Sequence, residues 1–381
     1  MFHKIVLLLI ALQISFISCY ANESDMAQEL KQLISKISSE NHENNMSIED
    51  EMMLLSKNLS EKRVTPINIQ AIDQDNYLLY ERDAPLNHMA SKNANKTETH
   101  CIVKHISGDG VSKNINTLNN VELFHITKMY KVDKNKYVAV GYEQDLTKDS
   151  THQAVAMLID ETGKTLWKTI VGRGKSYSEA VVQTHSGEYV VVGHDFVWEN
   201  SDKDSGNYHV MVAKVDQQGE RLWTKHYSLD GRFAKGRNIE KTQDDGFIII
   251  GETLYKAWIF KIDALGNKVW ETFLDTSKTA DRAYSIADNH QDGYIVTGLS
   301  NGTYPENDKA WIIKINYSGE IDLNIPVSLP EPFMIQTVNQ INANKFMLTG
   351  FYPGAISNSS FFMKIDSDGK KVSEKIVKLK Q

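Results

Sequence analysis

One ten-residue phrase recurs three times along this chain, and it constrains the fold more than any other feature. It reads LIDETGKTLW at 158–167, KVDQQGERLW at 214–223 and KIDALGNKVW at 261–270. Asp, Gly and Trp keep the same spacing in each copy. Self-similarity at a fixed period is the signature of a repeat architecture, in which each unit completes its core against its neighbours.

Weaker copies extend the phrase to six units of about 50 residues. A Ser, Asp or Asn stands three residues before the glycine in every copy, and the tryptophan is missing from copies one, five and six. The aligned glycines are Gly110, Gly163, Gly219, Gly266, Gly319 and Gly369.

A second phrase, an apolar run that usually ends in glycine, precedes each copy of the first. The runs are NYLLYE (76–81), KYVAVG (136–141), EYVVVG (188–193), GFIIIG (246–251), GYIVTG (293–298) and KFMLTG (345–350). With further apolar stretches before and after them, they give each unit four short β-type segments separated by Asp, Asn and Gly turns. No helical 3.6-residue period lies between the units.

These units predict an all-β fold. A four-stranded sheet of this size cannot bury both faces alone, and radial stacking of six such sheets solves the problem. We therefore expect a six-bladed β-propeller over residues 63–381, with seven blades as the alternative.

The recurring Asp, Gly and Trp are expected to be structural rather than ligand-binding. Asp caps the turn between the third and fourth strands, Gly takes a positive φ there, and Trp wedges between blades from the fourth strand. These residues are Asp160, Gly163, Trp167, Asp216, Gly219, Trp223, Asp263, Gly266 and Trp270.

The stretch DETGKTLW (160–167) resembles the repeat of pyrroloquinoline-quinone-type propellers, which include quinoprotein dehydrogenases and BamB-like outer-membrane assembly lipoproteins. Paired with the second phrase, the motif also looks like a broad set of exported bacterial propellers without assigned chemistry. The resemblance covers about residues 64–379 and implies a propeller fold. The resembled dehydrogenases hold quinone, calcium and often haem, but the sequence has no C-x-x-C-H haem motif. We expect no cofactor.

The N-terminus has the form of a secretory signal peptide over residues 1–21. An apolar run, Ile5–Ser18, follows Lys4 and leads to Cys19-Tyr20-Ala21. Cleavage after Ala21 is one interpretation, and lipidation of Cys19 is the other. Both predict an exported protein that is periplasmic, in the cell envelope or secreted. Residues 22–62 show apolar positions at 3–4 spacing, which predicts a short helical extension.

Composition excludes some partners. A net charge of −7 gives no general attraction for nucleic acid. No apolar run beyond the signal peptide is long enough to span a bilayer, so we expect membrane association only if Cys19 is lipidated. We expect a monomer.

No catalytic or metal-binding motif is visible. His185 and His194 flank one apolar run without a third ligand, so no metal site is predicted. The lone Cys101 of the mature chain is expected to be a small buried hydrophobe.

Loops that join successive units share one face of a propeller with the long loops between second and third strands. That face is predicted to carry aromatic and arginine side chains, the composition of an interaction hot spot. The candidate partner-binding residues are Arg173, Tyr177, Trp198, Tyr208, Arg232, Arg237, Arg282 and Tyr304.

Two functions follow. The first is a non-catalytic exported propeller that binds a protein partner in the bacterial cell envelope, as a scaffold, an assembly factor or a toxin-neutralising protein. The alternative is an enzyme or binding module that takes a glycan or small molecule in the central funnel. If Arg173, Arg237 and Arg282 point away from the channel, the enzyme hypothesis loses its main support.

Overall fold

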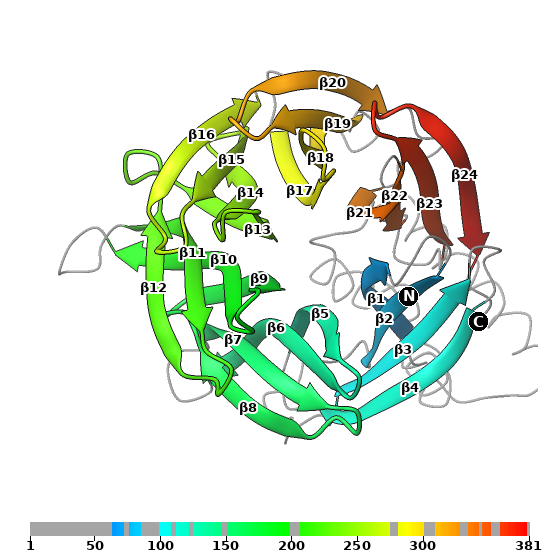
Figure 1. Cartoon of the computed structure of the whole chain (residues 1–381). Helices are drawn as coiled ribbons and strands as arrows, with labels where there is room; N and C mark the ends of the chain where they lie inside the picture. The colour runs from blue at the N-terminus through cyan, green and yellow to red at the C-terminus, as the bar shows by residue number, and fades with distance from the viewer. Residues whose placement is uncertain are drawn as a thin grey trace, which may run out of the picture.

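A computed structural model describes twelve ranges of the chain: 63–71, 76–84, 99–107, 112–121, 125–145, 151–198, 206–274, 281–300, 309–327, 334–342, 345–351 and 359–378. Their strands form six four-stranded antiparallel sheets, each built from four strands in chain order. Figure 1 shows the sheets arranged around an axis, with the first strand of each sheet innermost and the fourth at the rim. The architecture is a β-propeller.

The strands have the following bounds. Sheet 1 contains β1 (Arg63–Ala71), β2 (Asn76–Ala84), β3 (Thr99–Ser107) and β4 (Ser112–Val121). Sheet 2 contains β5 (His125–Asp133), β6 (Lys136–Asp145), β7 (Thr151–Asp160) and β8 (Thr165–Ile170). Sheet 3 contains β9 (Ser176–Gln183), β10 (Tyr189–Trp198), β11 (Gly206–Val215) and β12 (Arg221–Tyr227). Sheet 4 contains β13 (Ala234–Lys241), β14 (Phe247–Thr253), β15 (Lys256–Ile262) and β16 (Lys268–Leu274). Sheet 5 contains β17 (Asp281–Asp288), β18 (Gly293–Ser300), β19 (Lys309–Asn316) and β20 (Ile321–Val327). Sheet 6 contains β21 (Met334–Asn342), β22 (Lys345–Phe351), β23 (Ser359–Asp366) and β24 (Lys371–Lys378).

The core lies between sheets. Buried side chains of the described residues form five apolar clusters, each shared by two sheets that follow one another in the chain. Sheets 1 and 6 meet through their inner strands β1 and β21. The central strands are almost continuously apolar because both of their faces are covered; β14 is buried along its whole length. Cys101 is fully buried in the cluster between sheets 1 and 2.

The predicted fold class needs correction. The seven-blade alternative is wrong, because the described strands are used up by six sheets. A ring of six equivalent blades is also not matched in full, since the described residues supply five inter-sheet cores. The helical extension predicted at 22–62 lies outside the described residues, and the part of the chain that the structure describes contains no helix.

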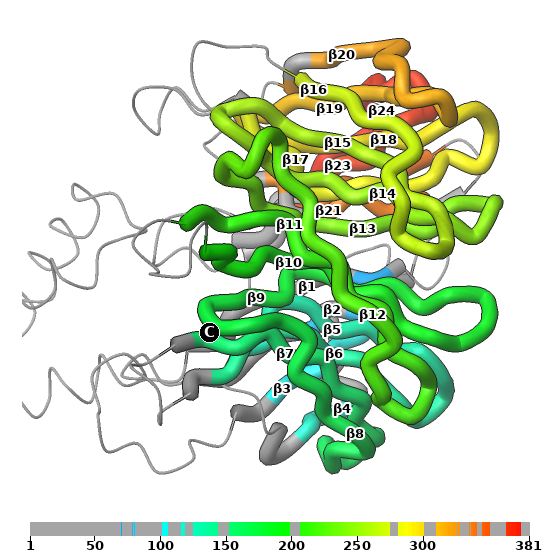
Figure 2. The backbone as a smooth tube through the Cα atoms, turned by 90° about the vertical axis from the view of Figure 1, so that its left-hand side faces the viewer, coloured from blue at the N-terminus to red at the C-terminus, as the bar shows by residue number. Residues whose placement is uncertain are grey.

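The ring has two faces, a loop face and a hairpin face. The inner strands begin at the loop face, and the turns between first and second strands and between third and fourth strands lie on the hairpin face. Figure 2 views the ring from the side, with the hairpin face on the right. No helix long and apolar enough to cross a membrane occurs among the described residues. The predicted signal peptide, residues 1–21, and Cys19 lie outside them.

The turn phrase closes each hairpin between a third and a fourth strand. In sheet 2, Asp160 Oδ1 accepts hydrogen bonds from the backbone N–H groups of Thr162 at 2.9 Å and Lys164 at 3.0 Å. Gly163 has a φ of 93°, which favours glycine. The Thr162 hydroxyl also donates to Asp160 Oδ1, at 2.6 Å. This side-chain hydrogen bond, together with the two backbone ones, holds the pKa of Asp160 below its ordinary value. The same turn recurs at Asp216, Asp263, Asn316 and Asp366.

Tryptophans at the rim reach the turn of the next sheet. The Trp167 indole Nε1 donates to the Gln217 carbonyl oxygen at 3.1 Å, and a Cβ built on Gly219 would lie 2.8 Å from its ring. Trp270 has the same relation to Gly319. Trp223 is partly buried against the core between sheets 3 and 4, and there Tyr227 hydroxyl donates to the Gly266 carbonyl oxygen at 2.7 Å. Glycine at these turns therefore leaves room for the neighbouring outer strand.

Candidate functional site

A β-bulge interrupts every inner strand at the same place. One residue is skipped in the pairing between the first and second strand of each sheet. In sheets 2 to 6 the break lies beside the glycine that ends the second sequence phrase, for example Gly193 and Gly251. A Cβ at either glycine would overlap a carbonyl oxygen of the inner strand. A bulge bends a strand and re-aims a side chain. The skipped residues are Ile67, Thr127, Glu179, Arg237, Tyr284 and Gln336.

Bulge residues of sheets 3 to 5 meet in an ion network near the loop face. The Arg237 guanidinium lies 2.7 Å from Glu252 Oε1 and 3.8 Å from Glu179 Oε1. Arg282 Nε lies 2.6 Å from Glu252 Oε2. Arg237 also lies over the Tyr284 ring, 5.8 Å from its centroid. We call Glu179, Arg237, Glu252 and Arg282 the ion network.

Burial and neighbouring charges shift the pKa values of residues in the ion network. Burial alone would favour the neutral form of Arg237, but Glu179 and Glu252 raise its pKa overall. Burial raises the pKa of Glu179, although Arg237, Lys235 and Lys128 oppose the shift. Arg237 is therefore a firm cation, and Glu179 is more easily protonated than an ordinary glutamate because its pKa is raised.

Beside the ion network, aromatic and imidazole rings form a continuous row across sheets 2 and 3. Tyr177 is central: its ring lies 5.0 Å from that of Tyr142 and 4.9 Å from that of His194, and its hydroxyl is 2.8 Å from His152 Nδ1. The aromatic row consists of His125, Tyr142, His152, Tyr177, His194, Tyr208, Phe196 and Trp198, with successive centroids 4.7–5.3 Å apart.

The row becomes more exposed toward its Trp198 end. His194 is buried, and this burial, with Lys235 and Arg237 nearby, holds its pKa well below the ordinary value. Trp198 is 42% exposed. The Lys235 ammonium lies 5.2 Å from the centre of the Tyr208 ring, and that of Lys175 lies 5.8 Å from the centre of the Phe196 ring. The row therefore ends on the surface as aromatic rings beside cations.

The structure brings together most of the predicted partner-binding residues. Tyr177, Tyr208 and Trp198 belong to the aromatic row, whereas Arg237 and Arg282 belong to the ion network. Two others lie on the loop face with exposed side chains: Arg173, whose backbone N–H donates to Asp195 Oδ2 at 2.9 Å, and Arg232 in a turn. Tyr304 lies outside the described residues.

Several members of the site were missed by the sequence reasoning. Glu179, Tyr284 and Glu252 carry no motif, and Tyr142 and His152 look like scattered residues. The bulge recurs at the same position relative to the glycine of the second phrase. That glycine could therefore have identified the equivalent inner-strand positions in successive units.

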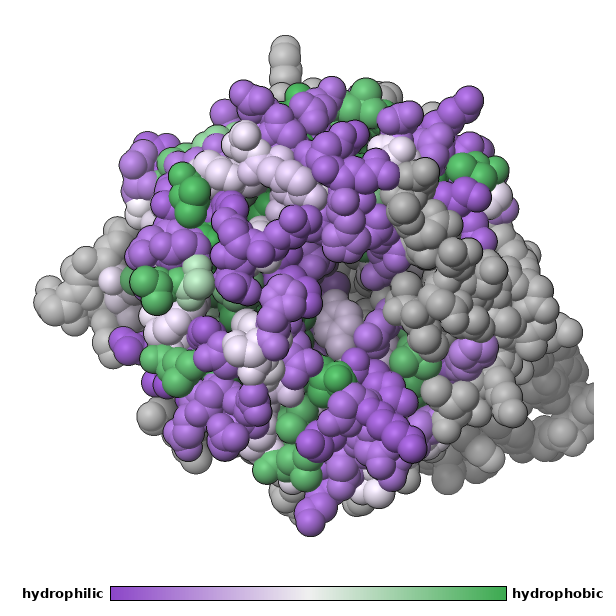
Figure 3. Space-filling view, in the orientation of Figure 1, coloured by the Kyte–Doolittle hydropathy of each residue, from purple (hydrophilic) through white to green (hydrophobic). Residues whose placement is uncertain are grey.

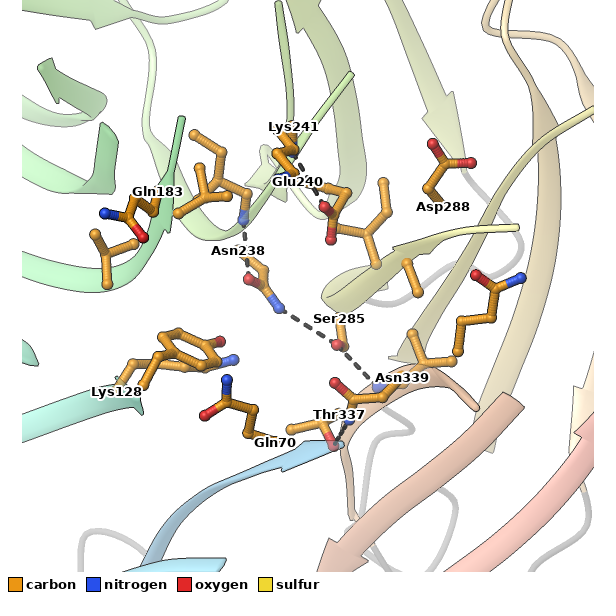
Figure 4. A pocket seen from close by; sticks show the side chains of 18 of the residues that line it. Gln70, Lys128, Gln183, Asn238, Glu240, Lys241, Ser285, Asp288, Thr337 and Asn339 are labelled. Carbon is orange, nitrogen blue, oxygen red and sulfur yellow. Dashed lines mark hydrogen bonds between the residues drawn. The ribbon is translucent and has the colours of Figure 1, made fainter. Parts of the chain in front are cut away.

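A second polar region is a central cavity of about 420 Å³ lined by inner strands. Figure 4 shows side chains from several strands converging on it, among them Lys128, Asn238, Glu240 and Asn339. Its residues come mainly from the second halves of the inner strands, so it lies toward the hairpin face. Figure 3 shows that face, which is mainly hydrophilic and hollowed at its centre.

Glu240, on the wall of the cavity, makes the stability of the protein depend on pH. Burial raises its pKa from 4.5 to about 7, and nearby Asp288 adds to the shift. Because the folded pKa is the higher one, this group's stabilising contribution is full below about pH 4.5 and is lost as the pH rises through about 7.

We expect Glu240→Gln to raise the free energy of unfolding by about 2 kcal/mol at about pH 8 and to change it little at about pH 4.5. Urea unfolding at both pH values checks this; equal effects at the two would contradict it.

No group of three or more His, Cys, Asp or Glu side chains within the described ranges is placed to hold a metal ion.

Comparison with known proteins supports the fold and leaves the family open. No protein-family model matches the chain, and no curated protein matches it in sequence. A protein of unknown function from Dyadobacter fermentans is similar in structure, with a TM-score of 0.51, 10% identity, and coverage of 82% of this chain and 94% of that one. A protein from Lactobacillus plantarum has a TM-score of 0.50 and 14% identity, covering 81% of this chain and 84% of that one. At such low identities, this similarity concerns the fold alone. Membership of the quinone-type propeller family stays a prediction.

Proposed function

We propose that this chain is an exported, non-catalytic β-propeller that binds a protein partner through its loop face over sheets 2 to 4. The observation that carries the proposal is the aromatic row, which runs from a packed interior to the exposed Trp198. Binding energy at protein interfaces concentrates in Trp, Tyr and Arg that sit on a well-packed base. The row supplies such a base, since the Trp198 ring packs on Phe196 and Phe196 in turn packs on Tyr208.

Charge on the same face indicates the chemistry of the partner. Arg173, Lys175 and Arg232 are exposed on this face, whereas the chain as a whole carries a net charge of −7. These exposed cations favour a partner that presents acidic side chains around an apolar or aromatic anchor. The anchor would contact Trp198 and the acids would approach the exposed cations.

The ion network favours binding over catalysis. An enzyme that holds a substrate carboxylate with arginines needs guanidinium groups free to receive it. Arg237 and Arg282 are both already paired with Glu252, at 2.7 and 2.6 Å. Separating them from Glu252 would leave a buried carboxylate unpaired, which costs several kcal/mol. The network is therefore better suited to holding sheets 3 to 5 in register below a binding surface.

The place of action comes from the sequence. The predicted signal peptide supports export, and a lipid on Cys19 would fix the protein to a membrane surface in the envelope. An assembly, scaffold or toxin-neutralising role is compatible with a rigid ring that offers one binding face. Because the aromatic row and the loops of that face are on one side only, the ring would bind its partner from one direction.

Substitution of Trp198 tests the proposal. Mature wild-type protein, Trp198→Ala and Leu265→Ala would each be immobilised and used to capture proteins from the envelope extract of the source cells. Leu265 is a matched control, because it is an apolar residue 70% exposed in a turn of the hairpin face. We expect a stoichiometric partner on wild type and Leu265→Ala, with recovery at least about tenfold lower on Trp198→Ala.

Two results of the capture experiment would contradict the proposal. Equal recovery on Trp198→Ala and wild type, or loss on Leu265→Ala alone, would show that the partner does not use the loop face. Thermal unfolding of the three proteins confirms that the variants remain folded.

A further inference from the structure

The central cavity has the features of a small-molecule site and is separate from the loop-face surface. Its volume of about 420 Å³ lies in the lower part of the range found for ligand pockets, about 300–1,000 Å³. Side chains of the inner strands of all six sheets line it. A ligand there would contact every sheet of the ring.

Amide and hydroxyl groups on the wall are held in place before any ligand arrives. Asn238 Nδ2 donates to Ser285 Oγ at 3.3 Å, and Ser285 Oγ accepts from the Val338 N–H at 2.9 Å. Asn339 Nδ2 donates to Thr337 Oγ1 at 3.1 Å. Figure 4 shows this chain of hydrogen bonds along the cavity wall. Fixed polar groups lose little entropy on binding, which favours recognition of hydroxyl groups.

Gln70 is fixed in the same manner from the other side. Its Oε1 accepts from the Lys131 N–H at 3.0 Å and from the Tyr80 hydroxyl at 2.5 Å. Its Nε2 donates to the Lys131 carbonyl oxygen at 3.3 Å. The amide therefore keeps one orientation at the edge of the cavity.

The Lys128 ammonium is not paired with the acids of the cavity. It is half-buried on β5 and has no side-chain hydrogen bond or ion pair within the part of the chain that the structure describes, although its charge acts on Glu179. Glu240 on β13 accepts a hydrogen bond from the Lys241 N–H at 3.2 Å. Asp288 on β17 accepts from the Tyr317 hydroxyl at 3.0 Å and lies 3.4 Å from His290 Nδ1. A half-buried ammonium without a direct ion-pair partner favours an anion, while the acids opposite accept hydroxyl groups.

We propose that the central cavity binds a small polyhydroxylated carboxylate, of the sugar-acid class. Its carboxylate would pair with the Lys128 ammonium. Its hydroxyl groups would contact the amides of Asn238 and Asn339 and the carboxyl groups of Glu240 and Asp288. The site requires no covalent chemistry and no metal, and it is independent of the protein partner proposed for the loop face.

Calorimetric titration of the mature protein tests this, with D-glucuronate as the probe and D-glucose and acetate as matched controls. We expect glucuronate to bind with a dissociation constant of about 1 mM or lower. Glucose lacks the carboxylate and acetate lacks the hydroxyl groups, so each should bind at least about tenfold more weakly.

Substitutions at Lys128 test whether its ammonium binds the ligand carboxylate. Lys128→Met should weaken glucuronate binding at least about tenfold, while Lys128→Arg and the distant Leu265→Ala should keep it. Absence of glucuronate binding to wild type would overturn the proposal. Equal binding of glucuronate and glucose, or an unchanged affinity in a folded Lys128→Met, would overturn it as well. Should Lys128→Met not fold, the ligand series on wild type decides.

Discussion

Gly251→Ala is expected to destabilise the protein by more than about 3 kcal/mol, or to prevent folding. Gly251 lies on β14 beside the bulge of β13, and a Cβ there would overlap the carbonyl oxygen of Lys235. The obstacle is backbone, so no side-chain rotation relieves it. The inner strand would have to move and would carry Arg237 with it. Urea or thermal unfolding of the purified variant measures the loss.

Gly174→Ala is the matched control for this effect. Gly174 has a φ of 65°, and nothing lies within 4 Å of an added Cβ. Its substitution should therefore cost only the strain of a left-handed alanine, about 1 kcal/mol. If Gly251→Ala lost no more stability than Gly174→Ala, the bulge would not be the reason for glycine at the end of the second phrase.

Arg237→Met should cost about 3 kcal/mol at neutral pH. The substitution keeps the length of the side chain but leaves Glu179 and Glu252 without their shared cation. Removing one member of a buried ion pair leaves an uncompensated charge, which costs more than the pair contributed. Arg232→Met is the control, because Arg232 is exposed and its loss should change stability by no more than about 0.5 kcal/mol.

The defect of Arg237→Met should depend on pH in a defined direction. Burial already raises the pKa of Glu179, and Arg237 is the first of the charges that oppose this shift. Without Arg237 the folded pKa rises further above the ordinary 4.5. A raised folded pKa gives stability that is full below the unfolded value and is lost as the pH rises through the folded one. The deficit should therefore be smallest near about pH 4 and should grow toward about pH 8. A deficit that grew on acidification would contradict the assignment of charges.

Much of the fold can be predicted from the sequence because the turns are local. Asp160 and Gly163 define a hairpin through contacts within four residues, and the same spacing recurs in the other units. The apolar runs between the turns then identify the strands, and their repetition indicates a propeller.

The number of blades and the closure of the ring depend on contacts between distant units, and this part of the prediction was less accurate. Whether all sheets pack alike depends on side chains from units far apart in sequence. The described residues provide five inter-sheet cores, and the contact of sheet 1 with sheet 6 runs through β1 and β21. Copy one also has Glu81 where later copies have glycine, so its repeat pattern says little about how it closes the ring.

The candidate site was predictable in part. Aromatic and arginine residues near the loops predicted that Tyr177, Tyr208 and Trp198 lie on one face, and the structure places them together in the aromatic row. The sequence does not show that Arg237 and Arg282 share Glu252, because the three residues meet only through the bulge of β13 and the neighbouring strands. The cavity is a further example, since its wall combines residues from all six units.

Site-specific photo-cross-linking in the cells that make the protein tests the central claim, that the loop face binds a protein partner. A photoreactive phenylalanine analogue would replace Trp198 in one variant and Leu265 in another. We expect a discrete cross-linked protein from position 198 and none from position 265. A discrete adduct from position 265, with none from position 198, would contradict it.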